Sequence, residues 1–453
     1  MNCSQSASNL INIDGNSTAI NETSFSNNTK LHWVSQCNQR GTFDILWSCI
    51  LTITLCTWTV LHLNLPAPSE GFWIIARRKA KWTTLTLLGP EFVLGIAVGQ
   101  KGNAKRCLRC FQRLKVSAES WSLRHSFFAN MGGFHIKFRD WDSFPITGRQ
   151  ICYLIENGHI NLPQITEQDI KDKSKADGLA KLIVLIQVAW FVIQVVARAI
   201  QHLPITTIEL TTIGLVIYTA ATYMQWLKKP LDIDRPIILH AECTIEEIWE
   251  KWEKAPPGRN AVENWKYTPL DFIEKHSPSF INDVLPVLNQ QRNPKDRPWQ
   301  RIPNDRFPHM VGDFEIWCHF AVTLLYSAIH AIGWHFSFPT MVEMILWRVS
   351  SLLIVILNLA FVICESITTG RLAKVFNRAQ REQRVLALAT TLPPPQVDIP
   401  FSIPLWKILI LALIGFIYTG ARIYILVEMF VGLRLLPVKA YLNVEWTDFI
   451  PHF

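Results

Sequence analysis

The sequence lacks the short motifs that identify most soluble enzymes and metal-binding domains. It contains no glycine-rich phosphate loop, no dinucleotide-binding fingerprint and no internal repeat. Its ten cysteines include a single Cys-x-x-Cys pair, Cys107 and Cys110, and no second pair that would complete four zinc ligands. From these absences we expect no bound metal and no soluble cofactor. We expect the pair to be ordinary thiols that are suited to acylation at a membrane surface.

An apolar core close to Met1 is also missing, so a cleavable signal peptide is not expected. The first 42 residues are instead polar and rich in Ser, Asn and Thr, and they contain the four Asn-x-Ser/Thr triplets of the chain. A tail of this composition produces single triplets by chance, but four in one tail favour contact with the glycosylation machinery. The predicted acceptors are Asn2, Asn16, Asn21 and Asn27.

Long apolar runs dominate the rest of the chain. Of the 453 residues, 49% are hydrophobic, and they are concentrated in stretches rather than spread along the chain. The stretches are about 20 residues long, the length that crosses a bilayer core of roughly 30 Å. The net charge of +8 comes from Lys and Arg that border these runs, which indicates topology and lipid contact rather than nucleic-acid binding. The sequence therefore predicts an integral membrane protein.

Basic residues at the ends of the runs predict how the chain crosses the membrane. Lys and Arg cluster after the first run, which would therefore be an uncleaved anchor with its N-terminus outside. Two later pairs of runs each enclose a short turn without Lys or Arg, at 201–204 and 337–340. Each pair predicts a hairpin that enters from the cytosol and returns to it. A last run exits to the outside and leaves the C-terminal tail there.

The apolar stretch 82–99 does not fit a simple span. It is basic on both flanks and contains Gly89, Pro90 and Glu91 in its middle, and a Gly-Pro break weakens a continuous helix. We predict a re-entrant or interfacial helical hairpin here. The expected fold is thus an all-α membrane protein with about six transmembrane helices plus this element. A count of seven spans, in which 82–99 crosses the membrane, is the alternative.

The predicted organisation alternates membrane segments with polar ones. The segments are a glycosylated non-cytosolic tail (1–42), a first transmembrane helix (43–65), a cytosolic segment that contains the re-entrant element (66–178), a hairpin (179–227), a second cytosolic segment (228–312), a second hairpin (313–364), a basic cytosolic loop (365–402), a last transmembrane helix (403–430) and a non-cytosolic tail (431–453). We expect both large cytosolic segments to consist of helices and loops. The basic loop predicts a helix with one basic face, which lies on lipid headgroups or faces water. Its residues are Arg371, Lys374, Arg378, Arg381 and Arg384.

Charged residues inside the apolar runs need partners, because an ionised side chain deep in lipid costs roughly 2.5 to 3.5 kcal/mol on insertion scales. Arg198 and Glu209 lie about two turns from the bend on opposite arms of the first hairpin, which predicts an ion pair near its outer end. Glu343, Arg348 and Arg422 are the other interior charges that we place in the outer half. For all five we expect a structural role in fixing helix partners.

Four further residues are candidates for acid–base chemistry. Glu315, His319 and His330 share one face of a predicted helix with Tyr326, and Glu91 belongs to the re-entrant element. Such groups supply a general acid or a proton relay, although purely structural hydrogen bonding explains them equally well. A metal site is poorly supported, because His330 lies about three turns from the other two. We place Glu91, Glu315 and His319 nearer the cytosol than His330.

Three parts of the chain resemble a large group of multi-pass membrane proteins of filamentous fungi, most of which have no assigned activity. They are residues 172–237, 338–351 and 418–453, and the resemblance extends over about 43–453. It implies the multi-pass topology and a fungal setting. Some members lie beside natural-product biosynthetic genes, which implies a role in handling apolar intermediates. The resemblance supplies no catalytic motif.

These observations favour a protein of a fungal secretory or plasma membrane that handles a hydrophobic small molecule in a polar interior. Its partners would be that molecule and membrane lipids, with no nucleic acid. The most concrete expectation is an accessory enzyme of secondary metabolism, a cyclase or isomerase that works by proton transfer. A transporter or channel is the alternative, because the two similar hairpins are typical of transporters. A receptor or structural membrane protein is a third possibility.

Overall fold

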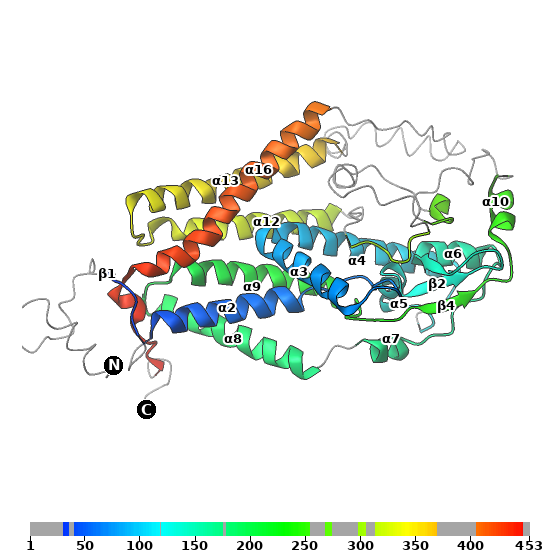
Figure 1. Ribbon diagram of the computed structural model, residues 1–453, viewed down its shortest axis with the longest axis horizontal. Coiled ribbons are helices and arrows are strands. Elements are labelled where there is room, and N and C mark those ends of the chain that lie inside the picture. The colour runs from blue at the N-terminus through cyan, green and yellow to red at the C-terminus, as the bar shows by residue number, and fades with distance from the viewer. Residues whose placement is uncertain are drawn as a thin grey trace, which may run out of the picture.

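The computed structural model describes residues 30–35, 40–117, 119–174, 178–253, 268–273, 298–304, 313–368 and 405–446. The predicted glycosylation sites and the basic residues between Arg371 and Arg384 lie outside these ranges. Within them the chain is predominantly helical, as predicted, and forms a long bundle with a small α/β domain at one end (Figure 1). Four helices are long and apolar enough to cross a membrane, and the count rises to five if a sharply bent pair is one span.

Within the described ranges, six of the long helices correspond to the predicted spans. They are α2 (Thr42–Thr59), α8 (Gly178–Ile200), α9 (Thr207–Trp226), α12 (Asp313–Ile332), α13 (Met341–Thr368) and α16 (Leu405–Val431). The four that meet the length and hydropathy requirement are α2, α8, α13 and α16. Large apolar side chains such as Leu185 and Ile186 of α8 are exposed on the outside of the bundle, as lipid contact requires.

The helix α9 is enclosed by the others. It packs against α2, α4, α12 and α16, and most of its residues are buried. Its threonines form hydrogen bonds within the helix, and its one glycine, Gly214, lies in van der Waals contact with Tyr326 and Ile329 of α12. Helices pack closely where their side chains are small and where each polar side chain is hydrogen-bonded within its own helix. This central position explains why α9 is less apolar than a lipid-facing helix.

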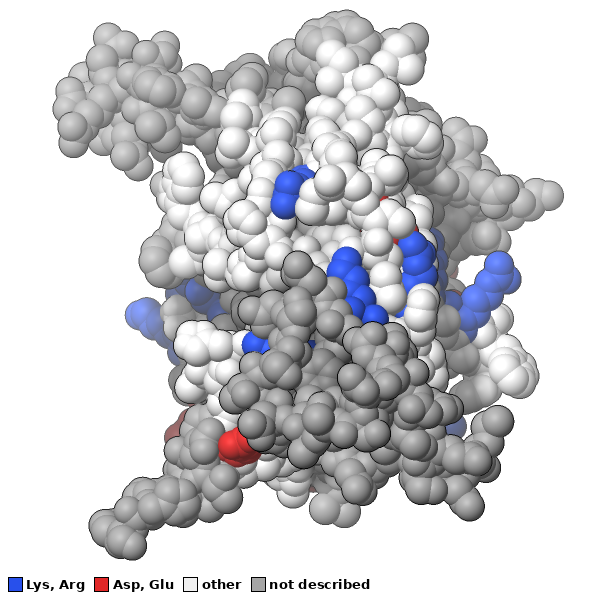
Figure 2. Space-filling view, turned by 90° about the vertical axis from the view of Figure 1, so that its left-hand side faces the viewer, with Lys and Arg blue, Asp and Glu red and all other residues white. Residues whose placement is uncertain are grey.

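Both ends of the described chain lie at the same end of the bundle. The strand β1 (Lys30–Leu31) pairs antiparallel with β5 (Leu436–Pro437), which follows α16. The turns that join α8 to α9 and α12 to α13 lie at this end too (Figure 1). Figure 2 looks onto this end, where Lys and Arg side chains are separated by uncharged residues.

The helices α3 (Phe72–Leu88) and α4 (Pro90–Arg113) meet at Gly89 with a bend of 111°. Pro90 cannot continue α3 because it lacks an N–H and its ring clashes with the preceding turn, but it fits the first position of α4. Gly89, Pro90 and Glu91 are buried, so the tip of the pair lies inside the bundle. Both helices lead from this tip toward the α/β domain (Figure 1).

The α/β domain corrects the expectation of an all-α chain with purely helical or looped cytosolic segments. Its mixed sheet has the order β3-β2-β4, with β2 (Phe134–Lys137) antiparallel to β3 (Phe144–Ile146) and parallel to β4 (Ile237–His240). Residues 66–178 and 228–312 therefore meet in one sheet across the α8–α9 hairpin. Four short helices pack around the sheet: α5 (Leu123–Asn130), α6 (Gly148–Glu156), α7 (Glu167–Lys173) and α10 (Ile245–Glu253).

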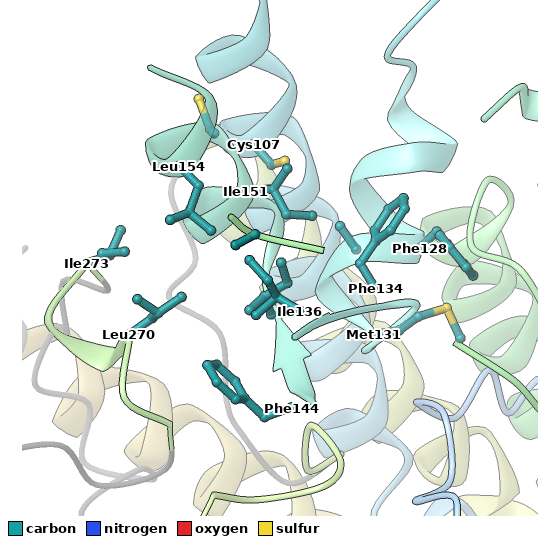
Figure 3. Close-up of a cluster of buried hydrophobic side chains, with 14 of the residues drawn as sticks. Cys107, Phe128, Met131, Phe134, Ile136, Phe144, Ile151, Leu154, Leu270 and Ile273 are labelled. Carbon is teal, nitrogen blue, oxygen red and sulfur yellow. The ribbon is translucent and has the colours of Figure 1, made fainter. Parts of the chain in front are cut away.

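This domain has a hydrophobic core of its own. Figure 3 shows Phe134 and Ile136 of β2 among side chains from α5, β3 and α6. The ring of Phe128 packs directly on Gly133, where a Cβ atom would lie 2.5 Å from it, so this position requires glycine. Complete burial of these aromatic side chains stabilises the domain by roughly 1.5–3 kcal/mol per residue. A separate core of this kind lets the domain pack independently of the bundle.

A disulfide joins α4 to α6 inside the domain. It links Cys110 to Cys152, which are 42 residues apart in the sequence. The expectation of an ordinary thiol at Cys110 is therefore wrong. The Cys-x-x-Cys spacing pointed to Cys107 as the neighbour of Cys110, but the fold of β2 and β3 brings α6 back onto the face of α4 that carries Cys110. Cys107 instead packs against Gly148 of α6.

Candidate functional site

The tip of the bent pair delivers Glu91 to the middle of the bundle. Glu91 is the second residue of α4 and is 7% exposed, and its Oε1 accepts a hydrogen bond from the hydroxyl of Tyr418 in α16. Asn358 of α13 lies close enough to interact with the same carboxyl group. The Gly89-Pro90 break thus carries Glu91 into contact with the last helix, one turn before Arg422.

One turn after Tyr418, Arg422 lies against α12. Its Nη1 is 3.3 Å from Nε2 of His330, and its guanidinium lies 4.7 Å from the ring centroid of Tyr326. An arginine only donates hydrogen bonds, so Nε2 of His330 accepts this one and the imidazole proton is on Nδ1. Arg422 also attracts Glu91 electrostatically. Arg422, which the sequence grouped with the structural charges, thus lies beside the acid–base candidates Glu91 and His330.

We call Glu91, Tyr326, His330, Tyr418 and Arg422 the polar cluster. Two more helices complete its surroundings. Tyr218 of α9 lies with its ring centroid 4.8 Å from that of Tyr326. The indole of Trp347 in α13 donates to the carbonyl of His330 at 3.1 Å. Five helices, α4, α9, α12, α13 and α16, therefore converge on the polar cluster, which combines one acid, one imidazole and one guanidinium with aromatic rings.

Four atoms of the polar cluster are buried without a hydrogen-bond partner among the described residues. They are Glu91 Oε2, Tyr326 Oη, His330 Nδ1 and Arg422 Nε. A buried polar atom left unpaired costs about 1–3 kcal/mol, and native proteins contain few of them. Four at one place are suited to bind a polar group that does not belong to the chain, such as a functional group of a ligand or a water molecule.

The other two acid–base candidates lie outside the polar cluster. His319 is on α12, eleven residues before His330, which corresponds to about 16 Å along the helix. Its Nδ1 is buried and has no partner in the described part of the chain. Glu315 lies in the first turn of α12, where side chains are outside the described part. Of the four predicted residues, the structure brings Glu91 and His330 together.

The predicted Arg198–Glu209 ion pair is replaced by other contacts. Glu209 forms its ion pair with Arg40, just before α2, and also accepts from the backbone N–H and hydroxyl of Thr206. Arg198 instead donates to the backbone carbonyls of Pro204, Ala440 and Leu442 at 2.8–3.0 Å. Sequence reasoning treated the segments before α2 and after α16 as tails, whereas both fold over the end of the first hairpin and supply these partners.

Glu343 and Arg348 are also held by partners that the sequence did not indicate. Glu343 forms an ion pair with Arg434, beyond the end of α16. Arg348 donates to the carbonyl of Trp334 at 3.0 Å and lies 5.1 Å from the centroid of its ring. These contacts fix the end of the second hairpin at which its turn lies.

The sequence pattern placed Tyr326 on the helix face of His330, but neither Tyr326 nor Tyr418 was among the predicted site residues. Each lies four residues before a basic member of the polar cluster, His330 on α12 and Arg422 on α16. Residues at this spacing share a helix face. The repetition of a Tyr-x-x-x-basic pattern on two helices was therefore the available signal. The pattern could not predict that this face of α12 and this face of α16 meet at Glu91.

A family model described as "Family of unknown function (DUF8562)" matches residues 17–250 and 319–453. The chain belongs to this family. The matched part of this DUF8562 protein contains all five residues of the polar cluster and also His319, whereas Glu315 falls between the two matched segments. No curated protein and no solved structure matches the chain.

Proposed function

We propose that this DUF8562 protein is an integral membrane protein with six spanning helices, α2, α8, α9, α12, α13 and α16. Four of them are long and apolar enough by themselves, and α9 and α12 pack among the others. Both described chain ends lie at one end of the bundle, which an even number of spans requires (Figure 1). The α3–α4 pair is re-entrant, since both helices lead away from the buried tip toward the α/β domain.

The orientation follows from the Lys and Arg that border the apolar runs. By the positive-inside rule the α/β domain faces the cytosol, and both chain ends lie outside or in the lumen. The N-terminal tail is then accessible to glycosylation. Localisation in the secretory pathway or plasma membrane of a filamentous fungus agrees with this orientation and with the resemblance of the sequence to fungal multi-pass proteins.

The function that the polar cluster supports best is proton transfer to a hydrophobic small molecule inside the bundle. Glu91 carries the argument: Tyr418 holds its Oε1, while its buried Oε2 has no partner among the described residues. A proton on Oε2 is thus free to be given to a substrate. Burial favours the neutral acid, and Arg422 stabilises the carboxylate that remains after transfer.

A cyclisation or isomerisation fits this arrangement. The O–H bond at Glu91 Oε2 breaks, and the proton adds to a double bond or epoxide oxygen of the substrate. The cationic centre that results is stabilised by the aromatic rings of Tyr218 and Trp347. Loss of a proton from the rearranged substrate to the Glu91 carboxylate restores the acid, so the step balances without another reactant. An accessory role in fungal secondary metabolism fits such a reaction.

Gene replacement with metabolite profiling tests this proposal. In a strain that carries Glu91→Gln we expect an uncyclised or unisomerised precursor to accumulate, as in the deletion strain, because the amide has no acidic proton. Glu343→Gln is the matched control, since this carboxylate pairs with Arg434 outside the polar cluster, and it should leave the profile unchanged. A wild-type profile from Glu91→Gln at equal protein level would contradict an acid role.

Transport of a small solute is a second candidate, and the bent α3–α4 pair favours it. Broken helices whose N-terminal ends point into a bundle form substrate sites in many transporters. The same strains separate the two functions. An altered chemical structure in the accumulated compound indicates the enzyme, whereas an unaltered product retained inside the cell indicates transport.

A further inference from the structure

We propose that α12 carries a path for protons that leads to Glu91 from the end of the bundle that bears the α/β domain. The path consists of the imidazole of His319 and the hydroxyls of Thr323 and Ser327 on α12, and Asn358 on α13 positions its last step. It rests on the proposed function, because it supplies the proton that Glu91 gives to a substrate. Beyond the proposed function, the path specifies the side of the membrane from which the proton enters the bundle.

The three α12 residues form one polar stripe in the bundle interior. They follow each other at four-residue intervals, which places them on one helix face with a rise of about 6 Å per step. Thr323 and Ser327 are 5% and 0% exposed. The stripe begins near the α/β domain, because α12 starts at that end of the bundle (Figure 1). It therefore leads from that end toward the polar cluster.

Side chains of two neighbouring helices continue the stripe to Glu91. The hydroxyl of Ser327 accepts from the amide of Asn358 at 2.7 Å and donates to the carbonyl of Thr323 at 2.9 Å, so it must turn away from that carbonyl to pass a proton on. Asn358 also lies close enough to interact with Glu91. The hydroxyl of Tyr218 lies 3.5 Å from Oγ1 of Thr323. Steps of about 6 Å are spanned by one water molecule that forms two hydrogen bonds of about 2.8 Å each.

His319 is suited to begin the path. Its Nδ1 is buried without a partner in the described part of the chain, although a histidine is not needed to fill an apolar helix face. An imidazole takes up a proton at one ring nitrogen and releases one from the other. Each hydroxyl along the stripe likewise accepts one proton and donates another, and a water molecule held beside Asn358 carries the last step from Ser327 to Glu91, because the amide of Asn358 donates a hydrogen bond and does not itself carry protons. A proton entering at His319 thus yields a proton at Glu91 with no net change along the way.

The charged and titratable groups around the stripe explain why the path ends at Glu91. Glu91 is the acidic group that faces the stripe from α4, and Tyr218 faces it from α9. At the far end, α12 itself contributes Tyr326 and His330, and α16 contributes Tyr418 and Arg422. The positive charge of Arg422 lies beyond Glu91 and opposes further movement of a proton, as fixed cations do in selective pores.

Infrared spectroscopy of the full-length protein in lipid nanodiscs tests the path without any substrate. The carbonyl stretch of a protonated Glu91 is assigned as the band lost in Glu91→Gln, and its shift after transfer to D2O reports the rate at which the acidic proton exchanges. We expect His319→Phe and Thr323→Val each to slow this exchange by about tenfold, the effect of one hydrogen bond on a barrier. His335→Phe, an exposed histidine at the opposite end of α12, is the control and should exchange at the wild-type rate.

The outcomes separate the path from the proposed function. Slower exchange in both variants, with the band still present, supports the path. Wild-type exchange rates in both variants would overturn the path and leave Glu91 as the acid. Absence of any carboxylic acid band that depends on Glu91 would overturn the acid role, and the path with it. Thr323→Val preserves side-chain shape and so keeps the test decisive if His319→Phe fails to fold.

Discussion

Buried polar side chains occur in two kinds of surroundings in this bundle, which the threonines of α9 and the polar cluster illustrate. The hydroxyls of Thr211, Thr212 and Thr222 each donate to the carbonyl four residues earlier, at 2.7–3.0 Å, and so need nothing from neighbouring helices. Glu91 and Arg422 are equally buried, yet each keeps an atom without a partner in the described chain. Because such atoms are costly, we expect water molecules or a ligand group to pair with them.

Lys229 is a buried cation outside the polar cluster. It lies just beyond α9 and is 4% exposed. Its Nζ donates to three oxygens, the carbonyl of His62 and the side-chain amides of Asn64 and Gln100, at 2.5–3.1 Å. These oxygens are uncharged, so burial lowers the pKa of Lys229 from 10.5 to about 7. The Lys229 amine thus links the segment after α2 to α4, and its protonation state changes near pH 7.

We therefore expect Lys229 to make the stability of the protein increase with pH. Between pH 7 and 10.5 the unfolded chain keeps a proton that the folded protein has released. The free energy of unfolding then rises through this window by at most about 1.4 kcal/mol per pH unit, and this stability is lost as the pH falls through the folded pKa. Lys229→Met should flatten the slope in thermal unfolding, and Lys228→Met, at the exposed neighbour, should not. Parallel slopes for wild type and Lys229→Met would contradict the assignment.

At the scale of elements, local signals predicted breaks and hairpins but not strands. Gly89 and Pro90 predicted an interruption in an apolar stretch, and the structure has the 111° bend there, since the geometry of proline acts on its own turn. The strands β2 and β4 have only four residues each. They pair in parallel across the whole α8–α9 hairpin, and no local pattern specifies a partner so distant along the chain.

The disulfide between α4 and α6 gives the α/β domain a stability that depends on redox conditions. Closing a loop of 42 residues stabilises a fold by about 4 kcal/mol in the chain-entropy description. We expect a reducing agent to lower the thermal stability of the wild-type domain, and the double variant Cys110→Ser, Cys152→Ser to have the lower stability with or without the agent. Cys243→Ser, at a free cysteine of the same domain, should respond like wild type. A wild-type protein whose unfolding is insensitive to reduction would refute this contribution.

At the scale of the whole molecule, the sequence predicted which charges are buried better than it predicted their partners. Arg198 and Glu209 are 2% and 1% exposed, in agreement with the rule that ions in apolar runs face the interior. Their partners are Arg40, from before α2, and backbone carbonyls that follow α16. Periodicity places a residue on a face of its own helix, but only the tertiary fold decides which distant segment covers that face. For the same reason, periodicity could not predict that Glu91 contacts Tyr418, because the two residues lie on helices far apart in the sequence.

The same long-range contacts predict on which sides of the membrane the N-terminus and the α/β domain lie, and this prediction can be tested. Because β1 pairs with β5 at one end of the bundle and the α/β domain occupies the other (Figure 1), the proposed six spans would place β1 and the domain on opposite sides of the membrane. In intact cells we expect an N-glycosidase to increase the mobility of the protein, and replacement of Asn2, Asn16, Asn21 and Asn27 by Gln to abolish that shift.

The domain is tested in the same cells with a membrane-impermeant maleimide. Cys243 is partly exposed on the domain, so it should react only after permeabilisation, and Cys243→Ser identifies its signal. Labelling of Cys243 from outside together with an unglycosylated tail would mean that the whole molecule is inverted. That orientation would place the Cys110–Cys152 disulfide in an oxidising compartment, where such bonds persist. Labelling from outside together with a glycosylated tail would be incompatible with six spans, because the two ends of the bundle would then share one side.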